Sequence, residues 1–180
     1  MTRRMLYLPV MIAAAMAVAC AVALSAVSEK VKATFPGKNG RIAYSGFGGG
    51  TDGGIYTINS SGGGKFRVTN DAKGAFDSDY SPDGKRIAYA GYEGPDTEIY
   101  TISVDGGGKV KVTNNVKNEE VPSYSPDGEK IAYEGYKALG SSDDEDFDHE
   151  IYTIKIGGGG KTQVTDTAGY ASDPSCGSRP

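Results

Sequence analysis

Short apolar segments recur along the chain at regular intervals, with hydrophobic groups at both odd and even positions. The sequence Arg-Ile-Ala-Tyr at 41–44 recurs at 86–89 and, beginning with Lys, at 130–133. A second segment, Ile-Tyr-Thr-Ile, occurs at 55–58, 99–102 and 151–154. Strands with apolar groups on both faces are typical of a sheet that is covered on both sides. We therefore predict a strand at each of these places, buried between other elements.

The residues between these segments are typical of tight turns. Ser81-Pro82-Asp83-Gly84 precedes the second Arg-Ile-Ala-Tyr, and the same four residues recur at 125–128. Proline at the second position presets φ for a type I hairpin turn, and the glycine that follows allows a bulge. A run of glycines follows each Ile-Tyr-Thr-Ile and leads to a short segment that ends in Val-Thr, at 68–69, 112–113 and 164–165. We predict a further short strand that ends at each Val-Thr.

Together these segments form a unit of four short strands, named a to d in chain order. Strand a leads into Ser-Pro-Asp-Gly, strand b is Arg/Lys-Ile-Ala-Tyr, strand c is Ile-Tyr-Thr-Ile, and strand d ends in Val-Thr. The unit repeats after 44 or 45 residues, and after 52 where one loop is longer. A repeat of this length with four strands is the pattern of a β-propeller blade. The predicted fold is all-β, with three four-stranded antiparallel blades over residues 41–175.

The repeat resembles that of the TolB-like β-propellers, which is related in form to WD repeats. The resemblance is carried by Ser-Pro-Asp-Gly-Lys-Arg-Ile-Ala-Tyr at 81–89, followed by Glu-Ile-Tyr-Thr-Ile at 98–102. It extends from Thr34 to Ser175, and it is specific for the fold and not for the function. The family includes periplasmic scaffold proteins and the propeller domains of some serine peptidases, so the resemblance implies the fold and does not choose between these roles.

The end of the chain departs from the repeat. Pro174-Ser175-Cys176 follows Val164 at the interval at which Pro122-Ser123-Tyr124 follows Val112, so it has the position of a fourth strand a. A fourth Ser-Pro-Asp-Gly is expected next, but residues 176–180 do not continue it and are predicted to be irregular or truncated. Two explanations remain open. The chain is a piece of a longer propeller, or its last strand a joins the first b–c–d set and yields three blades.

Three blades are fewer than the four to eight of an ordinary closed propeller. An open arc of this kind exposes Tyr and Ile on the outer faces of its first and last blades, which makes those faces adhesive. The partial propeller is therefore expected to be completed by oligomerisation. Our hypothesis is a homodimer in which two chains form one six-blade ring, the blade number of the TolB family.

The N-terminal residues have the pattern of an export signal. Arg3 and Arg4 precede an uncharged apolar stretch, Met5–Val27, with small residues near its end. Residues 1–27 are therefore predicted to be a signal-peptide helix. Because the stretch is long, an uncleaved membrane anchor is one alternative, and lipidation at Cys20 is another. Residues 28–40 form a linker. We expect a periplasmic, secreted or cell-surface protein that touches a membrane only through this segment.

Composition narrows the classes of partner. The chain has 27 Gly and 12 Tyr, which suit many short strands joined by tight turns. Its formal net charge is −4 and its pI about 5.0, so nucleic acid is not an expected ligand. If residues 1–27 are removed, Cys176 is the one remaining cysteine, and stability must come from packing without an intrachain disulfide.

The connections of unequal length emerge at one end of the predicted blades. In a propeller the b–c and d–a connections lie at one rim, the loop rim, and the a–b and c–d turns lie at the opposite turn rim. The b–c connections vary, at 45–54, 90–98 and 134–150, and variable loops on a rigid scaffold are the usual place for a binding site. The carboxylates near the start of strand c are predicted to form a ring that binds a cation or a basic peptide. They are Asp52, Asp96, Glu98, Asp148 and Glu150.

The longest b–c connection contains an acidic run. We interpret it first as a solvated acidic loop, which is what charge runs usually form. The alternative is a calcium site, because hard oxygen ligands suit Ca²⁺ and a cation would relieve the repulsion between neighbouring carboxylates. Its ligands would be Asp143, Asp144, Asp146 and Asp148. The spacing does not match an EF-hand, and no other cofactor is expected.

The sequence has no motif that indicates an enzyme. His149 is the only histidine, and no Gly-x-Ser-x-Gly elbow, zinc cluster or phosphate-binding loop accompanies it. We expect His149 to be a surface residue. The predicted function is an exported, non-enzymatic binding or scaffold module that recognises a protein, peptide or cell-envelope ligand on the loop rim. The alternative is the propeller domain of a larger peptidase-like hydrolase or of a carbohydrate-active protein that uses rim carboxylates.

Overall fold

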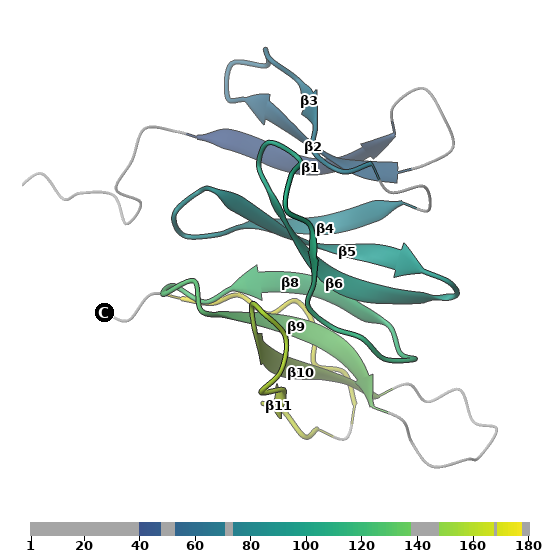
Figure 1. The fold of residues 1–180 in the computed structure, drawn as a ribbon. Helices are drawn as coiled ribbons and strands as arrows, with labels where there is room; N and C mark the ends of the chain where they lie inside the picture. Colours follow the sequence, from purple (N-terminus) through teal and green to yellow (C-terminus); the bar gives the residue numbers. More distant parts are fainter. Residues whose placement is uncertain (1–39, 48–52, 71–73, 138–147, 168, 178–180) are drawn as a thin grey trace, which may run out of the picture. The chain divides into compact units, whose positions relative to one another are not determined.

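The computed structural model describes residues 40–47, 53–70, 74–137, 148–167 and 169–177, all within one unit from Asn39 to Pro180. In these ranges the chain forms three antiparallel sheets and no helix, which confirms the all-β prediction (Figure 1). None of the elements in these ranges is therefore an apolar helix of membrane-spanning length. The predicted signal segment 1–27 and the linker up to residue 39 lie outside the described residues.

The three sheets are the predicted blades, and within each sheet consecutive strands of the chain pair with each other. Blade 1 has three strands, whereas blades 2 and 3 have four. Blade 1 consists of β1 (Arg41–Phe47), β2 (Gly53–Asn59) and β3 (Phe66–Arg67). Blade 2 consists of β4 (Ala75–Tyr80), β5 (Arg86–Glu93), β6 (Asp96–Ser103) and β7 (Val110–Lys111). Blade 3 consists of β8 (Glu119–Tyr124), β9 (Lys130–Lys137), β10 (Asp148–Lys155) and β11 (Thr162–Gln163).

Strands b and c are longer than the sequence pattern indicates. The pairing of β5 with β6 is uninterrupted: it begins with Arg86 opposite Ser103 and ends with Glu93 opposite Asp96. Only Gly94 and Pro95 remain of the connection that was expected at 90–98, so that expectation was wrong. The reason is that main-chain pairing continues beyond the apolar side chains by which a strand is recognised in a sequence.

The Ser-Pro-Asp-Gly turns at the turn rim are held by their own hydrogen bonds. The Gly84 amide donates to the Ser81 carbonyl over 2.8 Å and closes the predicted turn. Ser81 Oγ donates to Asp83 Oδ1 over 2.7 Å and accepts from the Arg86 amide over 2.9 Å. The same bonds recur in the turn at 125–130. Residues close in sequence therefore determine each of these a–b turns.

Strand d is short, and the Val-Thr pair fastens its end to strand c. The Val68 amide donates to the Ile55 carbonyl over 2.8 Å, and the Ile55 amide donates to Thr69 Oγ1 over 3.0 Å. The threonine hydroxyl thus replaces a main-chain partner. Blades 2 and 3 repeat both bonds at 112–113 and 164–165.

The hydrophobic cores lie between neighbouring blades, so both faces of blade 2 are buried, as the apolar pattern predicts. The core between blades 1 and 2 consists of Ile55, Val68, Ala75, Ile87, Tyr89, Tyr100 and Ile102. The core between blades 2 and 3 consists of Ala88, Ala90, Ile99, Val112, Tyr124, Ile131, Tyr133, Tyr152 and Ile154. Each fully buried isoleucine contributes about 1.5–3 kcal/mol, so inter-blade contact is the main source of stability.

Each blade also repeats a pair of tyrosines that a lysine covers. The tyrosine rings of strands b and c stack with centroids 5.8, 5.6 and 5.8 Å apart in blades 1, 2 and 3. The lysine that follows the glycine run places its Nζ 4.4, 4.2 and 4.3 Å from the ring centroid of the strand c tyrosine. This cation–π contact explains why each glycine run ends in Lys, at positions 65, 109 and 161.

Candidate functional site

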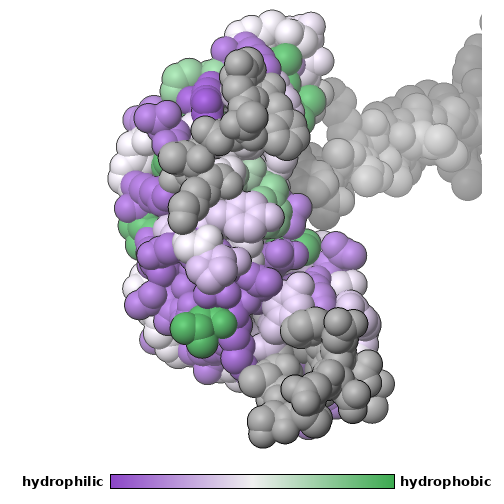
Figure 2. Space-filling view, turned by 90° about the vertical axis from the view of Figure 1, so that its right-hand side faces the viewer, coloured by the Kyte–Doolittle hydropathy of each residue, from purple (hydrophilic) through white to green (hydrophobic). Residues whose placement is uncertain are grey.

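The loop rim is the side of the molecule that carries the β5–β6 hairpin and the β3–β4 and β7–β8 connections, at the right of Figure 1. Figure 2 faces this side, and its described residues are mainly hydrophilic, with hydrophobic residues scattered among them. The described part of this surface suits a polar or charged ligand better than an apolar segment, because its described residues form no wide hydrophobic patch.

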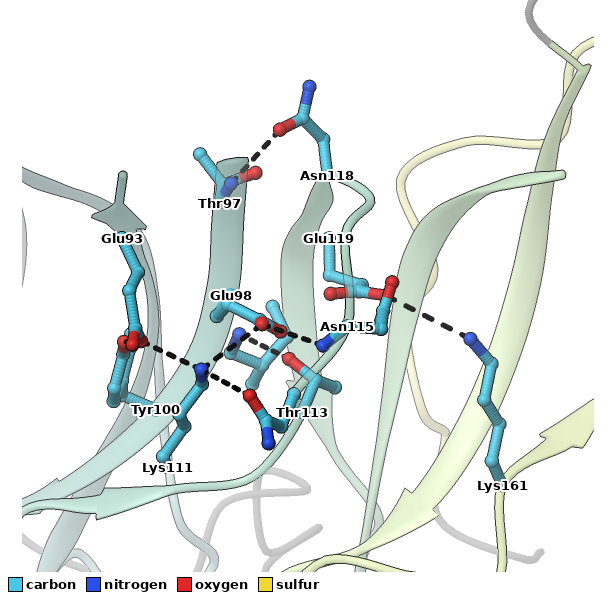
Figure 3. Close-up of polar contacts among 12 residues, drawn as sticks. Glu93, Thr97, Glu98, Tyr100, Lys111, Thr113, Asn115, Asn118, Glu119 and Lys161 are labelled. Carbon is cyan, nitrogen blue, oxygen red and sulfur yellow. Dashed lines mark hydrogen bonds and ion pairs between the residues drawn. The ribbon is translucent and has the colours of Figure 1, made fainter. Parts of the chain in front are cut away.

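Glu98, near the start of β6, is buried and bound to the protein itself. Its side chain is 2% exposed, and Oε1 accepts a hydrogen bond from the Asn115 amide over 2.8 Å (Figure 3). The same oxygen lies 3.2 Å from Lys111 Nζ, which also pairs with Glu93 at 2.7 Å. Partial burial opposes the charge on Lys111, but its bonds to Glu93 and Glu98 raise the pKa of this lysine. Glu98 therefore anchors the connection between β7 and β8.

Glu119, the first residue of β8, lies beside Glu98 and is fully buried. Its Oε1 accepts a hydrogen bond from the Asn115 side-chain amide and lies 3.8 Å from Lys161 Nζ. Burial raises the pKa of Glu119 to about 7, the Asn115 bond opposes this shift, and the neighbouring Glu98 adds to it. Glu119 therefore keeps its proton up to close to neutral pH, which relieves its repulsion with the neighbouring buried carboxylate.

A cavity of about 440 Å³ lies between blades 2 and 3 next to this pair. Two lysines and two amide side chains reach it, together with Tyr133, whose buried hydroxyl has no hydrogen-bond partner. These lining residues are Asn114, Asn115, Lys117 and Lys161. The cavity thus offers hydrogen-bond donors to a ligand, whereas the nearby glutamates offer acceptors.

Glu150 has the position in blade 3 that Glu98 has in blade 2. It is fully buried, and its carboxylate accepts hydrogen bonds from the Thr167 amide over 2.7 Å and from the Thr165 hydroxyl. Blade 1 has Gly54 at this position. The two glutamates thus fasten the chain that follows strand d, and their place at the start of strand c is explained by this structural role.

The predicted ring of carboxylates is not a set of exposed side chains. Glu98 and Glu150 are buried and Asp96 is half-buried, whereas Asp52 lies outside the described residues. Asp148 begins β10, and its side chain is outside the description. Ligand binding by these five residues stays a prediction.

The predicted calcium ligands fall mostly outside the described residues. Asp143, Asp144 and Asp146 lie in the range 138–147, and Asp148 is the only one in a described strand. Among the residues that the structure describes, no group of three or more acidic, histidine or cysteine side chains could hold a metal ion. The calcium site stays a prediction.

His149 is not a surface residue, contrary to expectation. Its side chain is 8% exposed, and Nδ1 pairs with the buried Glu134. The ring lies between Tyr136 and Tyr170, with centroids 4.2 Å away on each side. The expectation failed because the acidic run suggested a loop, whereas β10 begins before His149 and aligns it with Tyr136 of β9. His149 also accepts the Ala171 amide at its carbonyl, over 2.9 Å, and so holds the C-terminal segment.

A second group of carboxylates gathers near the first strands of blades 2 and 3, and we name it the inner acidic cluster. Its members are Asp77 of β4, Glu120 of β8, Glu134 of β9 and Asp173. Burial raises the pKa of Asp77, and the charges of Asp173 and Glu134 add to this shift against a main-chain bond from Val121. Burial likewise raises the pKa of Glu120, with further repulsion from Asp77 and Glu134.

Sequence reasoning missed the inner acidic cluster because its members do not occupy one position of the repeat. Asp77 and Asp173 align with each other, but the aligned residue of blade 3 is Val121, and Glu120 aligns with Phe76. The only available signal was that strand a carries acidic residues in place of apolar ones. Their proximity follows from the packing of the blades.

Comparison with known proteins supports the fold. No protein-family model matches the sequence, and no curated protein matches it. Two solved TolB structures do match, a protein assigned as TolB from Agrobacterium tumefaciens and TolB from Acinetobacter baumannii. The first is 24% identical with a TM-score of 0.59 over 68% of this chain and 44% of its own. The second is 23% identical with a TM-score of 0.58 over 75% of this chain and 32% of its own.

The chain therefore spans less than half of the length of both solved TolB structures. An acylaminoacyl peptidase from Pyrococcus horikoshii is more distant: it is 16% identical with a TM-score of 0.46 over 58% of this chain and 19% of its own. Three stacked antiparallel blades, their repeated turns and these two matches lead to one conclusion: the chain has a TolB-like β-propeller fold.

Proposed function

We propose that this chain is an exported, non-enzymatic binding module that holds a basic group of a protein or peptide at its loop rim. The inner acidic cluster carries the proposal. Among the described residues, no Lys or Arg forms an ion pair with Asp77, Glu120 or Asp173. Carboxylates that raise one another's pKa attract a cationic side chain, because its charge relieves their repulsion.

The position of the cluster supports this assignment. Glu120 Oε1 accepts a weak hydrogen bond from Thr97 Oγ1 at the start of β6, over 3.5 Å, so the cluster adjoins the loop rim. Asp173 is exposed, and Asp77, although its neighbours partly desolvate its carboxylate, still presents surface to solvent. The deeper glutamates Glu98 and Glu150 bind the protein's own connections and act as supports for this rim.

Location outside the cytoplasm is also part of the proposal. The proposed location rests on Arg3 and Arg4 followed by the uncharged stretch 5–27. The fold supports it, because the chain has the fold of two TolB structures and the TolB-like family includes periplasmic proteins. Fractionation of cells that produce the full chain should place the protein outside the cytoplasm. Removal of residues 1–27 should then confine it to the cytoplasm.

Binding of a fluorescent oligolysine peptide, measured by anisotropy, tests the ligand class. The processed protein should bind oligolysine and not oligoglutamate. The double variant Asp77→Asn/Glu120→Gln should weaken this binding about tenfold. Because the pKa of both carboxyls is raised, binding should also weaken on acidification before ordinary carboxyls titrate.

The matched control is Glu129→Gln, which removes the same type of charge from an exposed position in an a–b turn at the opposite rim. It should leave the affinity unchanged. Equal binding of both peptides, or equal losses in the control and the double variant, would show that the rim does not recognise basic groups.

A photo-crosslinker placed at Val116 extends the test to a protein ligand. Val116 is 85% exposed in the d–a connection between β7 and β8, on the loop rim. In producing cells it should crosslink to a partner, and the yield should fall in the Asp77→Asn/Glu120→Gln background. A crosslinker at the exposed Pro126, in a turn of the opposite rim, should not.

A further inference from the structure

Among the residues that the structure describes, no blade covers the outer face of blade 1 as the preceding blades cover the corresponding faces of blades 2 and 3. Ile42 of β1 aligns with Ile87 of β5 and Ile131 of β9 in the repeat. Ile87 and Ile131 are completely buried by the preceding blade, whereas Ile42 is 52% exposed. The sequence at these positions is the same, so the difference comes from the missing neighbour and not from the residue.

The outer face of blade 3 is uncovered in a complementary way. Val68 and Val112 are each 4% exposed, because the next blade packs on them, whereas the aligned Val164 is 59% exposed. Within the chain, the face that carries Val68 packs on the face that carries Ile87, and the Val112 face packs on the Ile131 face. The outer faces of blades 1 and 3 therefore carry the same kinds of side chain as the two faces that pack together between neighbouring blades.

The edges of the blades are complementary as well. β5 and β9 each pair with a strand a, but in the described residues β1 pairs with β2 alone. The segment 171–177 shares a backbone feature with strand a, and no described strand pairs with it as a strand b. Asp173 has a φ of 52°, close to the 48° and 49° of the aligned Asp77 and Val121.

This segment is also held in the place of a strand a. The Cys176 amide donates to Ser123 Oγ of blade 3 over 3.2 Å. The aligned bond between blades 2 and 3 runs from the Tyr124 amide to Asp79 Oδ2 over 2.8 Å. The segment therefore lies on its own chain, next to blade 3. No described strand pairs with its other edge, which has the place of the edge that pairs with a strand b in blades 2 and 3.

We propose that a second copy of this chain covers both outer faces, so that two chains close head to tail into one six-blade ring. Segment 171–177 of each copy then adds to the free edge of β1 of the other as the missing strand a. Tyr80 pairs with Ile87, and Tyr124 pairs with Ile131. By the same register, Cys176 of one copy lies opposite Ile42 of the other. Two identical head-to-tail contacts close the ring and leave no face uncovered.

Mass and crosslinking test the proposal. Sedimentation equilibrium of the processed protein should give twice the mass of one chain. Ile42→Cys should then form an intermolecular disulfide with Cys176 of the second copy under mild oxidation, visible as a covalent dimer on a non-reducing gel. Adding Cys176→Ser should abolish the crosslink, and Val116→Cys, also exposed but far from the contact in the repeat, should not form it.

Charge at the contact provides a second measurement. Ile42→Asp and Val164→Asp should each raise the dissociation constant of the dimer at least about hundredfold, because each buries an unpaired carboxylate. Val116→Asp should have no effect. Circular dichroism that matches the parent protein will show that the variants fold.

A particle of single-chain mass would overturn the proposal, and it is the outcome expected if residues 1–38 or another protein cover these faces. An open series of larger particles would exclude the closed ring. A dimer in which the Ile42→Cys variant forms no crosslink to Cys176, or one that resists both aspartate variants, would show a different contact.

Discussion

The Ser-Pro-Asp-Gly turns and the loop rim are built from contacts of different range. At the turn rim, Ser81 bonds to Asp83 and Arg86, and the whole arrangement lies between residues 81 and 86. At the loop rim, Glu98 binds the Asn115 amide, and Glu119 lies near Lys161 in another strand connection. A turn that satisfies its own polar groups can be copied between blades without change. A rim that relies on distant partners depends on how the blades pack.

The same difference explains which rim varies. Both Ser-Pro-Asp-Gly turns have the same bonds, whereas the position of Glu98 is occupied by Glu150 in blade 3 and by Gly54 in blade 1. Each glutamate accepts the main-chain amide that its own blade presents. The loop rim can therefore change its chemistry from blade to blade while the sheets remain alike, which suits a binding surface.

The largest effect is expected from removal of a buried carboxylate at the loop rim. Glu98→Ala leaves the Asn115 amide without its acceptor and takes one of two carboxylates from Lys111. We expect the free energy of unfolding to fall by about 3 kcal/mol. Urea unfolding followed by circular dichroism, at one fixed protein concentration, measures the change.

Glu93→Ala is the matched control, because Glu93 also pairs with Lys111 but is half exposed. Its removal should cost much less than that of Glu98, since water can replace an exposed carboxylate. Equal losses in the two variants would show that the loop rim does not depend on its buried partners, and the contrast between the rims would fail.

The pH dependence of stability provides the next largest effect. The pKa of Glu119 is about 7 in the folded protein and has an ordinary value of 4.5. Between these values the unfolded chain has lost this proton and the folded protein keeps it, so rising pH favours unfolding. Glu119→Gln cannot ionise. Relative to the parent protein, it should therefore gain about 2 kcal/mol in the free energy of unfolding between pH 4.5 and pH 8.

Unfolding curves of both proteins across this pH range are the measurement. Glu129→Gln, at an exposed turn position, should keep the pH profile of the parent protein. If the Glu119→Gln profile is also unchanged, then Glu119 titrates like an exposed carboxyl, and the folded protein does not retain a proton on it near neutral pH.

The smallest change in the free energy of unfolding is expected at the turn rim, where a tight turn requires a glycine with a positive φ. Gly84 has a φ of +69°, whereas Gly63 is not in the left-handed region, and neither would bring an added Cβ within 4 Å of other atoms. Gly84→Ala should lower the free energy of unfolding by about 1 kcal/mol. Gly63→Ala should be neutral or slightly stabilising. Thermal unfolding of the pair compares them, and equal midpoints would contradict the local origin of the turn.

The blades were predictable because each is encoded within its own repeat. Ile-Ala-Tyr and Ile-Tyr-Thr-Ile indicated strands b and c, and Ser-Pro-Asp-Gly indicated the turn before strand b, all of which the structure confirms. The candidate site was not predictable to the same degree. Glu98 and Glu150 were recognised as carboxylates near strand c, but their burial could not be seen in the sequence. His149 was misplaced for the same reason.

The sequence by itself determined the blade, since alternating apolar residues, turn residues and the repeat length act over a few positions of the chain. It also determined the apolar faces that require neighbouring blades, at Ile87 and Ile131 as well as at Ile42. Only the tertiary structure decided which of these isoleucines is covered, which carboxylates are buried, and which meet in the inner acidic cluster. Solvation and charge repulsion depend on distances between residues that are far apart in the chain, and only the packing of the blades sets those distances.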